Sequence, residues 1–199
     1  KNQDDRFLMN AGEVMPVTAH IENNENEFKI KLFDTLDPKN SSKKIAKDFT
    51  APINYLTRRA KLIPKITAII KTNQYIDGIG LHRMNPFDPN KIPVILIHGF
   101  KSNPSTWVNL INQLQSDPKI RNRFQFWTFS YPTGIPILYS TMRLRNELNS
   151  MRDFYDPKGN NKNLNNMVLV GHSMGGIIAR LLSSTSNKTF KDWLPSGST

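Results

Sequence analysis

The stretch that decides the fold is residues 167–180, which read MVLVGHSMGGIIAR. Four apolar residues come first, a short run GHSMG follows, and further apolar residues then recur at helical spacing. This order predicts a strand, a tight turn and a helix. The turn carries Ser173, and a serine placed there is lifted out of the edge of the sheet with its hydroxyl exposed.

The two glycines of the turn, Gly171 and Gly175, stand two residues before and two residues after Ser173. A turn this sharp forces strained backbone angles at the serine and brings the chain before it close to the chain after it. Side chains at positions 171 and 175 would then collide, so glycine is expected at both positions.

A second motif begins with the apolar run VILI at residues 94–97, which His98, Gly99 and Phe100 follow. Four consecutive apolar residues predict a strand buried on both faces, as in a parallel sheet covered by helices. Ligands of such sheets bind at the carboxyl ends of the strands. We therefore expect the loop after this strand and the turn at Ser173 to face one crevice.

With these two motifs the chain resembles the α/β-hydrolase superfamily, in which a G-x-S-x-G turn presents the nucleophilic serine. The form Gly-His-Ser-Met-Gly, combined with His-Gly-Phe after the earlier strand, is most similar to lipases, esterases and the GPI-inositol deacylase-like group. The resemblance implies that Ser173 is the nucleophile and that the backbone N–H groups of Phe100 and Met174 form the oxyanion hole. Such a donor can stabilise the transition state by about 3 kcal/mol.

The resemblance also implies supporting roles for the neighbouring residues. Gly99 lets the loop approach closely, His98 shapes that loop, and His172 packs beside the turn that Gly171 and Gly175 make possible. Both histidines are thus expected to be structural.

A serine hydroxyl is a weak nucleophile and needs a histidine to take its proton and a carboxylate to orient that histidine. In the resembling enzymes both residues follow the serine along the chain. Here no histidine follows Ser173, and Asp192 is the only acid after it. His20 and His82 lie on weakly defined strands, and neither is expected to be the base. We therefore expect the triad acid and histidine to lie outside this chain, in a missing half of the fold.

The predicted fold class is α/β, with a mostly parallel sheet, helices on both faces and a truncation after the helix that follows Ser173. Residues 91–184 read as strand and helix three times in alternation, which builds a parallel sheet through right-handed crossovers. We divide the chain into a loose terminal arm (1–11), amino-terminal strands and helices of the hydrolase domain (12–90), and a core that is incomplete at its carboxyl end (91–199).

In the amino-terminal part, alternating apolar residues predict a hairpin of residues 14–21 and 28–36 that opens the sheet. Thr50 and Pro52 predict a helix that begins there and runs to about Ala60. Residues 62–71 combine an apolar stripe with lysines, a pattern of helices that pack on their own domain and of helices that lie on membranes.

In the core, Asn103 is expected to cap a helix, and a strand is expected over residues 124–130. The loop at residues 131–136 is a candidate wall of an acyl pocket. The apolar faces of the two long helices are predicted at Trp107, Leu110, Ile111 and Leu114, and at Leu144, Leu148, Met151 and Tyr155.

The net charge of +11 comes entirely from beyond residue 50, since the first 50 residues carry 8 basic and 9 acidic side chains. This surplus is compatible with solubility alone or with peripheral contact with an anionic membrane surface. No nucleic-acid partner is expected, because no basic cluster is interleaved with aromatic residues. No apolar run approaches the roughly 20 residues that span a bilayer.

The chain has no cysteine and no cluster of metal-ligand residues, so neither a metal site nor a cofactor is expected. The polar start without methionine indicates a processed or trimmed end. For localisation, the lack of cysteine fits an exported or bacterial-envelope protein as well as a cytoplasmic one, and we lean slightly towards the first.

The functional prediction is a serine ester hydrolase that acts on acyl esters or lipids. Two alternatives remain open at this point. One is a non-catalytic hydrolase-like module that binds a partner or an apolar ligand. The other is a thioesterase, acyltransferase or peptidase, because these enzymes share the same turn and fold.

Overall fold

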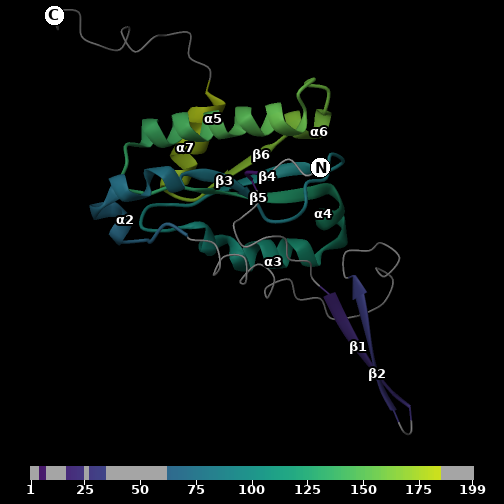
Figure 1. Ribbon diagram of the computed structural model, residues 1–199. Coiled ribbons are helices and arrows are strands. Elements are labelled where there is room, and N and C mark those ends of the chain that lie inside the picture. Colours follow the sequence, from purple (N-terminus) through teal and green to yellow (C-terminus); the bar gives the residue numbers. More distant parts are fainter. Residues whose placement is uncertain (1–4, 8–16, 25–26, 35–61, 185–199) are drawn as a thin grey trace, which may run out of the picture.

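The computed structural model describes residues 5–7, 17–24, 27–34 and 62–184. Its centre is a four-stranded sheet in the order β3-β5-β4-β6 (Figure 1). The strands are β3 (Gly80–Arg83), β4 (Ile92–Ile97), β5 (Phe124–Ser130) and β6 (Val168–Gly171). β4 runs parallel to β5 and β6, whereas β3 pairs with β5 in the antiparallel direction. The sheet is mostly parallel, so the predicted α/β class is confirmed.

Helices cover both faces of this sheet (Figure 1). One face carries α3 (Val108–Ser116) and α4 (Pro118–Arg123), which follow the short 3₁₀ helix η3 (Pro104–Trp107). The other face carries α5 (Ile137–Tyr155) and α7 (Met174–Ser183), with the short helix α6 (Lys162–Asn165) before β6. The alternation of strand and helix predicted for residues 91–184 is therefore present.

Two apolar cores lie on the two faces because successive residues of a strand point to opposite sides. On β5, Trp127 and Phe129 pack in the core under α5 and α7, and Phe126 packs in the core under α3. The residues of α5 that were predicted to face the sheet do so, with Leu144 and Met151 fully buried.

The start of the α3 region follows the predicted capping pattern. The Asn103 side chain accepts a hydrogen bond from the Ser105 amide at 3.1 Å, and Pro104 occupies the first turn of η3. The prediction for the buried face was wrong at Leu110, which is 36% exposed, while Val108 is buried in its place. The cause is that η3 changes to an α-helix at Val108, so the spacing counted from Trp107 shifts by part of a turn.

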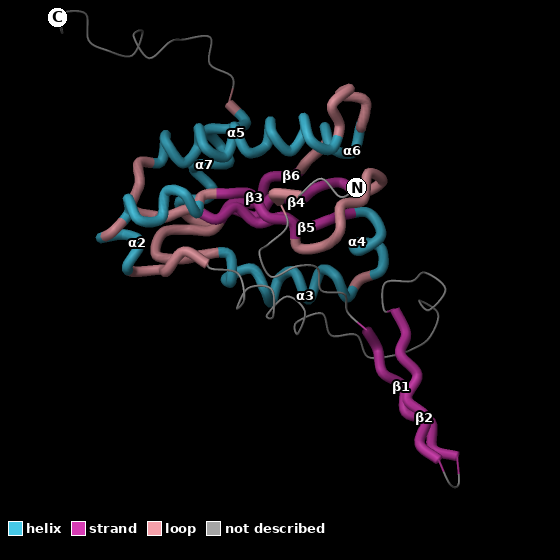
Figure 2. Tube along the Cα trace, viewed as in Figure 1, coloured by secondary structure: helices cyan, strands magenta, loops and turns pink. Residues whose placement is uncertain are grey.

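The predicted hairpin exists, but it does not open the central sheet. β1 (Val17–Asn24) and β2 (Glu27–Asp34) pair only with each other among the described residues and form a separate two-stranded sheet. Figure 2 shows this hairpin standing apart from the central strands. Its apolar face is largely solvent-exposed and consists of Val17, Ile21, Phe28, Ile30 and Leu32.

The described part of the predicted terminal arm is not loose. Phe7 is fully buried against Trp127 and Tyr155. The Asp5 carboxylate accepts hydrogen bonds from Arg83 Nε at 2.8 Å and from the Tyr155 hydroxyl at 2.6 Å. Residues 5–7 are therefore anchored to β3 and α5.

The basic amphipathic segment at residues 62–71 forms only one helical turn, α2 (Thr67–Ile70), before the 3₁₀ helix η2 (Thr72–Gly78). Ile63 and Ala68 are buried, whereas Ile66 and Ile70 are exposed. The helix predicted from Thr50 lies outside the described residues. No helix in the described part of the chain is long and apolar enough to cross a membrane.

Candidate active site

The sharp turn between β6 and α7 holds Ser173 at φ 53° and ψ −121°, a backbone conformation that residues other than glycine rarely adopt. Such a conformation costs about 1–3 kcal/mol and is found mainly at functional sites. Ser173 is also the N-cap of α7, a position where serine commonly accepts a hydrogen bond from the first turn. Its hydroxyl makes no such bond. The side chain is exposed, so the hydroxyl is not used to stabilise the helix.

The glycines around Ser173 are required by close approach of the backbone. A Cβ atom on Gly171 would collide with the carbonyl group of Gly175, and a Cβ atom on Gly175 would collide with the carbonyl group of Ile97. These are backbone atoms that cannot rotate away. The collision predicted from the sequence at positions 171 and 175 is thus confirmed, with β4 as an additional neighbour.

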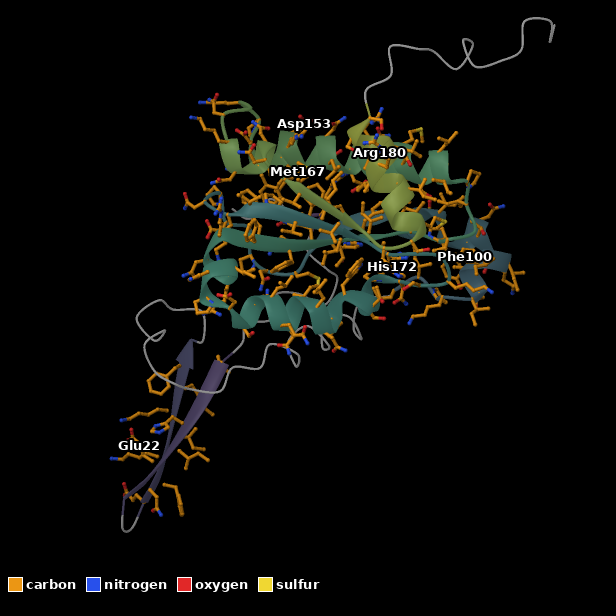
Figure 3. The ribbon with its side chains drawn as sticks, turned by 180° about the vertical axis from the view of Figure 1, so that it is seen from behind. Glu22, Phe100, Asp153, Met167, His172 and Arg180 are labelled. Carbon is orange, nitrogen blue, oxygen red and sulfur yellow. The ribbon has the colours of Figure 1, made fainter. Side chains whose placement is uncertain are left out.

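The loop after β4 lies directly against the turn. The His172 amide donates a hydrogen bond to the Ile97 carbonyl at 3.1 Å. A Cβ atom on Gly99 would lie 2.9 Å from His172 Nδ1 and 3.0 Å from the Ser173 Cβ atom. Gly99 therefore allows this loop to touch the serine, and Figure 3 shows the Phe100 and His172 side chains at the same end of the sheet.

Two amide donors are available beside the serine. Within the described residues, neither the Phe100 N–H nor the Met174 N–H donates a hydrogen bond, whereas the Gly175 and Gly176 amides bond to the His172 and Ser173 carbonyls. The Met174 amide belongs to the first turn of α7, where unpaired N–H groups and the helix dipole favour negative charge. Among the described residues both amides therefore lack an acceptor, and each can donate a hydrogen bond to a negatively charged group that lies close to it.

Two side chains of the β5–α5 loop, Tyr131 and Thr133, hydrogen-bond to the loop after β4. The Tyr131 hydroxyl donates a 2.6 Å hydrogen bond to the His98 carbonyl, and the two rings stack with centroids 4.4 Å apart. The Lys101 amide donates to Thr133 Oγ1 at 3.2 Å. Both Tyr131 and Thr133 are buried. The loop at residues 131–136, which was predicted to line an acyl pocket, thus directs these side chains into the protein.

The role of Tyr131 could not be predicted from the sequence, because hydrogen bonding to a main-chain carbonyl leaves no pattern of residue types. Burial of the phenol raises its pKa, so the hydroxyl stays protonated and remains a donor.

The histidines of the described residues do not supply an evident base for Ser173. His98 is fully buried, and desolvation lowers its pKa to about 4. Its Nδ1 atom lies 3.1 Å from the Gly99 carbonyl, which fits the structural role expected for it. His172 is exposed, and its Nδ1 atom lies against Gly99 rather than in a hydrogen bond with the Ser173 hydroxyl.

The two earlier histidines are remote. His82 lies on β3, three strands from β6, which corresponds to about 14 Å at the usual strand spacing. His20 lies on β1, where its ring is 3.6 Å from the Glu22 carboxylate. Asp192 lies outside the described residues, which also contain no group of three or more metal-ligand side chains that could hold a metal ion.

Comparison with known families agrees with this geometry. The profile of the PGAP1-like α/β domain matches residues 88–192, which is more than half of the chain. The chain belongs to the PGAP1-like α/β domain family. This family is part of the α/β-hydrolase superfamily. No curated protein and no solved structure matches the chain significantly.

The part of the chain that matches the PGAP1-like α/β domain begins just before β4 and includes β5, β6 and α7. Both loops of the candidate site therefore lie inside the matched region. Family membership indicates a hydrolase-like α/β domain, and the assignment of individual residues depends on the geometry described above.

Proposed function

We propose that the intact protein is a serine hydrolase that cleaves carboxylic ester bonds in acyl or lipid substrates. The observation that carries the proposal is the backbone of Ser173, which is strained at φ 53° and leaves the hydroxyl uncapped and exposed. Strain of this kind is retained where the surrounding structure and function require it. A serine that only caps a helix needs neither the strained backbone nor glycine at the two flanking positions, 171 and 175, where a Cβ atom would collide with the backbone.

In the proposed reaction, Ser173 Oγ bonds to the carbonyl carbon of the ester while its proton passes to a histidine. The carbonyl oxygen becomes an oxyanion, which accepts hydrogen bonds from the Phe100 and Met174 amides. Collapse of this intermediate breaks the ester C–O bond, and the alcohol leaves with the proton held by the histidine. Water then adds to the acyl group by the same route and releases the acid.

The histidine and its carboxylate partner are proposed to come from outside the described residues. Tyr131 and Thr133 would fix the position of the Phe100 amide through their bonds to the His98 carbonyl and the Lys101 amide. Because a donor in the oxyanion hole acts only when correctly placed, these bonds would affect the reaction without touching the substrate.

The test is covalent labelling of the intact protein with a fluorophosphonate probe, followed by peptide mass spectrometry. We expect the probe on Ser173, no labelling of Ser173→Ala, and unchanged labelling of the matched variant Ser183→Ala, which removes an exposed hydroxyl from the far end of α7. A folded intact protein that remains unlabelled, or that is labelled equally after Ser173→Ala, would refute the proposal.

One observation favours a second candidate, a non-catalytic binding module. No histidine of the described residues hydrogen-bonds to the Ser173 hydroxyl, so nothing in that part of the chain activates it. This candidate predicts that apolar esters bind to the intact protein and are not turned over, with equal affinity in the Ser173→Ala variant. A thioesterase would instead be labelled at Ser173 and would cleave acyl thioesters faster than the matching oxygen esters.

A further inference from the structure

The exposed large apolar side chains of the described residues include four on the segments that surround the loop after β4, at the end of the sheet where Ser173 lies. They are Ile66 just before α2, Ile70 at the end of α2, Phe100 after β4 and Leu138 at the start of α5, and their exposed fractions are 69%, 82%, 51% and 65%. We refer to these four residues as the apolar rim. Exposed apolar residues that gather in one region commonly mark a site of interaction with a partner or a membrane.

Contacts between the supporting segments place the rim beside the serine. Asn103 Nδ2 donates a 3.3 Å hydrogen bond to the Ile63 carbonyl, which joins the segment before α2 to the loop after β4. A Cβ atom on Gly134 would lie 2.8 Å from the Ile69 carbonyl oxygen, so α2 also packs against the β5–α5 loop. Since Gly99 contacts Ser173, all these segments meet at one edge, where Figure 3 shows Phe100 and His172.

Lysines accompany the rim. Lys65 and Lys71 flank α2, and Lys101 follows Phe100, with its Nζ atom 5.5 Å from the centre of the Phe100 ring. All three are exposed, and Lys65 is close enough to His98 to help lower the pKa of that imidazole. Residues 62–78, 98–105 and 131–138 contain these three lysines and a single acid, Asp77. The region is therefore both apolar and positively charged.

We propose that the apolar rim and its three lysines dock on an anionic lipid surface, so that Ser173 faces substrate held in that surface. Apolar side chains enter the boundary between headgroups and acyl chains, and neighbouring lysines are attracted to the negative charge of the lipids. The inference deepens the proposed function and rests on it for the source of the substrate. Docking itself needs no reactive serine, so the two ideas can fail separately.

The exposed apolar face of the β1–β2 hairpin fits an anionic surface less well. The described hairpin carries the acids Glu22, Glu27 and Asp34 against only two lysines, and one of these lysines is paired with Glu22 at 2.8 Å. Net negative charge opposes approach to anionic lipid, whereas the charge around the rim favours it.

The experiment is co-sedimentation of the intact protein with vesicles of phosphatidylcholine alone and with vesicles that also contain about one third phosphatidylglycerol. We expect binding to the anionic vesicles only, weakened by high salt. An attraction near 1 kcal/mol for each lysine corresponds to about fivefold in the partition coefficient, so replacing Lys65, Lys71 and Lys101 with Gln is expected to lower it by about a hundredfold. Ile66→Ser with Ile70→Ser is expected to lower it at least tenfold.

The matched control replaces Lys119 on α4, Lys158 in the turn after α5, and Lys162 on α6 with Gln, which removes the same total charge. The partition coefficient of this control variant is expected to fall less than threefold. A second control, Ser173→Ala, should bind vesicles like the unaltered protein, because docking is separate from catalysis.

Three outcomes would overturn the proposal: no binding to anionic vesicles, equal loss in the two lysine triples, or binding that is lost on Ile30→Ser in the hairpin and retained by the rim variants. Thermal unfolding of each variant shows whether it is folded. A vesicle-binding protein whose Ser173 resists the fluorophosphonate would retain the docking surface and lose the proposed catalytic function.

Discussion

The backbone strain at Ser173 predicts that serine is not the most stable residue at this position. At φ 53° and ψ −121° the Cβ atom is in an unfavourable position, and glycine removes it. Relief of about 1–3 kcal/mol is offset by about 0.5–1 kcal/mol, because glycine gives the unfolded chain more conformational freedom. Taking the middle of each range, Ser173→Gly is expected to raise the free energy of unfolding by about 1.3 kcal/mol, or the melting temperature by roughly 3–5 °C.

The matched variant is Ser173→Ala, which removes the hydroxyl and keeps the Cβ atom. Because the hydroxyl caps nothing in α7, this change should shift the free energy of unfolding by less than about 0.5 kcal/mol. Urea unfolding followed by circular dichroism measures both variants. If Ser173→Gly were no more stable than Ser173→Ala, the backbone strain would be absent and the argument for a functional serine would lose its main support.

Three further predictions concern the glycines of the turn, the support of the loop after β4, and the buried histidines. Gly171→Ala is expected to destabilise the fold by at least about 3 kcal/mol in urea unfolding, because its Cβ atom would collide with backbone atoms. Gly176→Ala should be neutral or stabilising, because its Cβ atom would lie 3.5 Å from its nearest neighbour, and equal effects of the two changes would contradict the close packing of the turn. Tyr131→Phe leaves the buried His98 carbonyl without its 2.6 Å hydrogen-bond donor, so it is expected to lower the free energy of unfolding by about 1–3 kcal/mol. It is also expected to slow fluorophosphonate labelling of the intact protein more than tenfold, and unchanged labelling would exclude a positioning role for Tyr131. Burial lowers the pKa of His98 and that of His82 from 6.5 to about 4, so between these pH values the unfolded chain binds protons that the folded chain does not, and the free energy of unfolding should fall as the pH is lowered from 6.5 towards 4. The fall should be smaller in His82→Gln, and an identical fall in this variant would show that the His82 imidazole is not buried.

The sequence predicted the centre of the fold because local rules are strong there. The continuous apolar run of β4 and the aromatic strand β5 are buried on both faces, which agrees with the parallel sheet expected from them. At the turn, the spacing of Gly171, Ser173 and Gly175 predicted a close approach of the backbone, and the structure has it.

Other features depended on long-range contacts that no local pattern encodes. Alternation identified β1 and β2 as strands, yet it could not show that they pair only with each other within the described part of the chain. Phe7 follows six polar residues, and its burial depends on contacts with Trp127 and Tyr155, which lie far along the chain. Ile66 and Ile70, at the two ends of the α2 turn, contribute to the apolar pattern of a packed helix, although both side chains are exposed.

The candidate site was likewise predictable only in part. The serine and the two amides follow from motifs, whereas the support from Tyr131 and Thr133 acts through main-chain atoms that are not visible in a residue pattern. No histidine or acid of the described residues shows a hydrogen bond to the Ser173 hydroxyl, so the base and acid of the proposed reaction do not follow from the motifs that predict the serine.

The proposed roles of Ser173 and the two amides are tested most directly by a crystal structure of the intact protein after reaction with a phosphonate ester, which mimics the tetrahedral intermediate. We expect phosphorus bonded to Ser173 Oγ and a phosphonyl oxygen about 2.7–3.1 Å from both the Phe100 and Met174 amide nitrogens. An adduct on Ser173 whose oxygen points away from both amides, or an adduct on another residue, would contradict these roles.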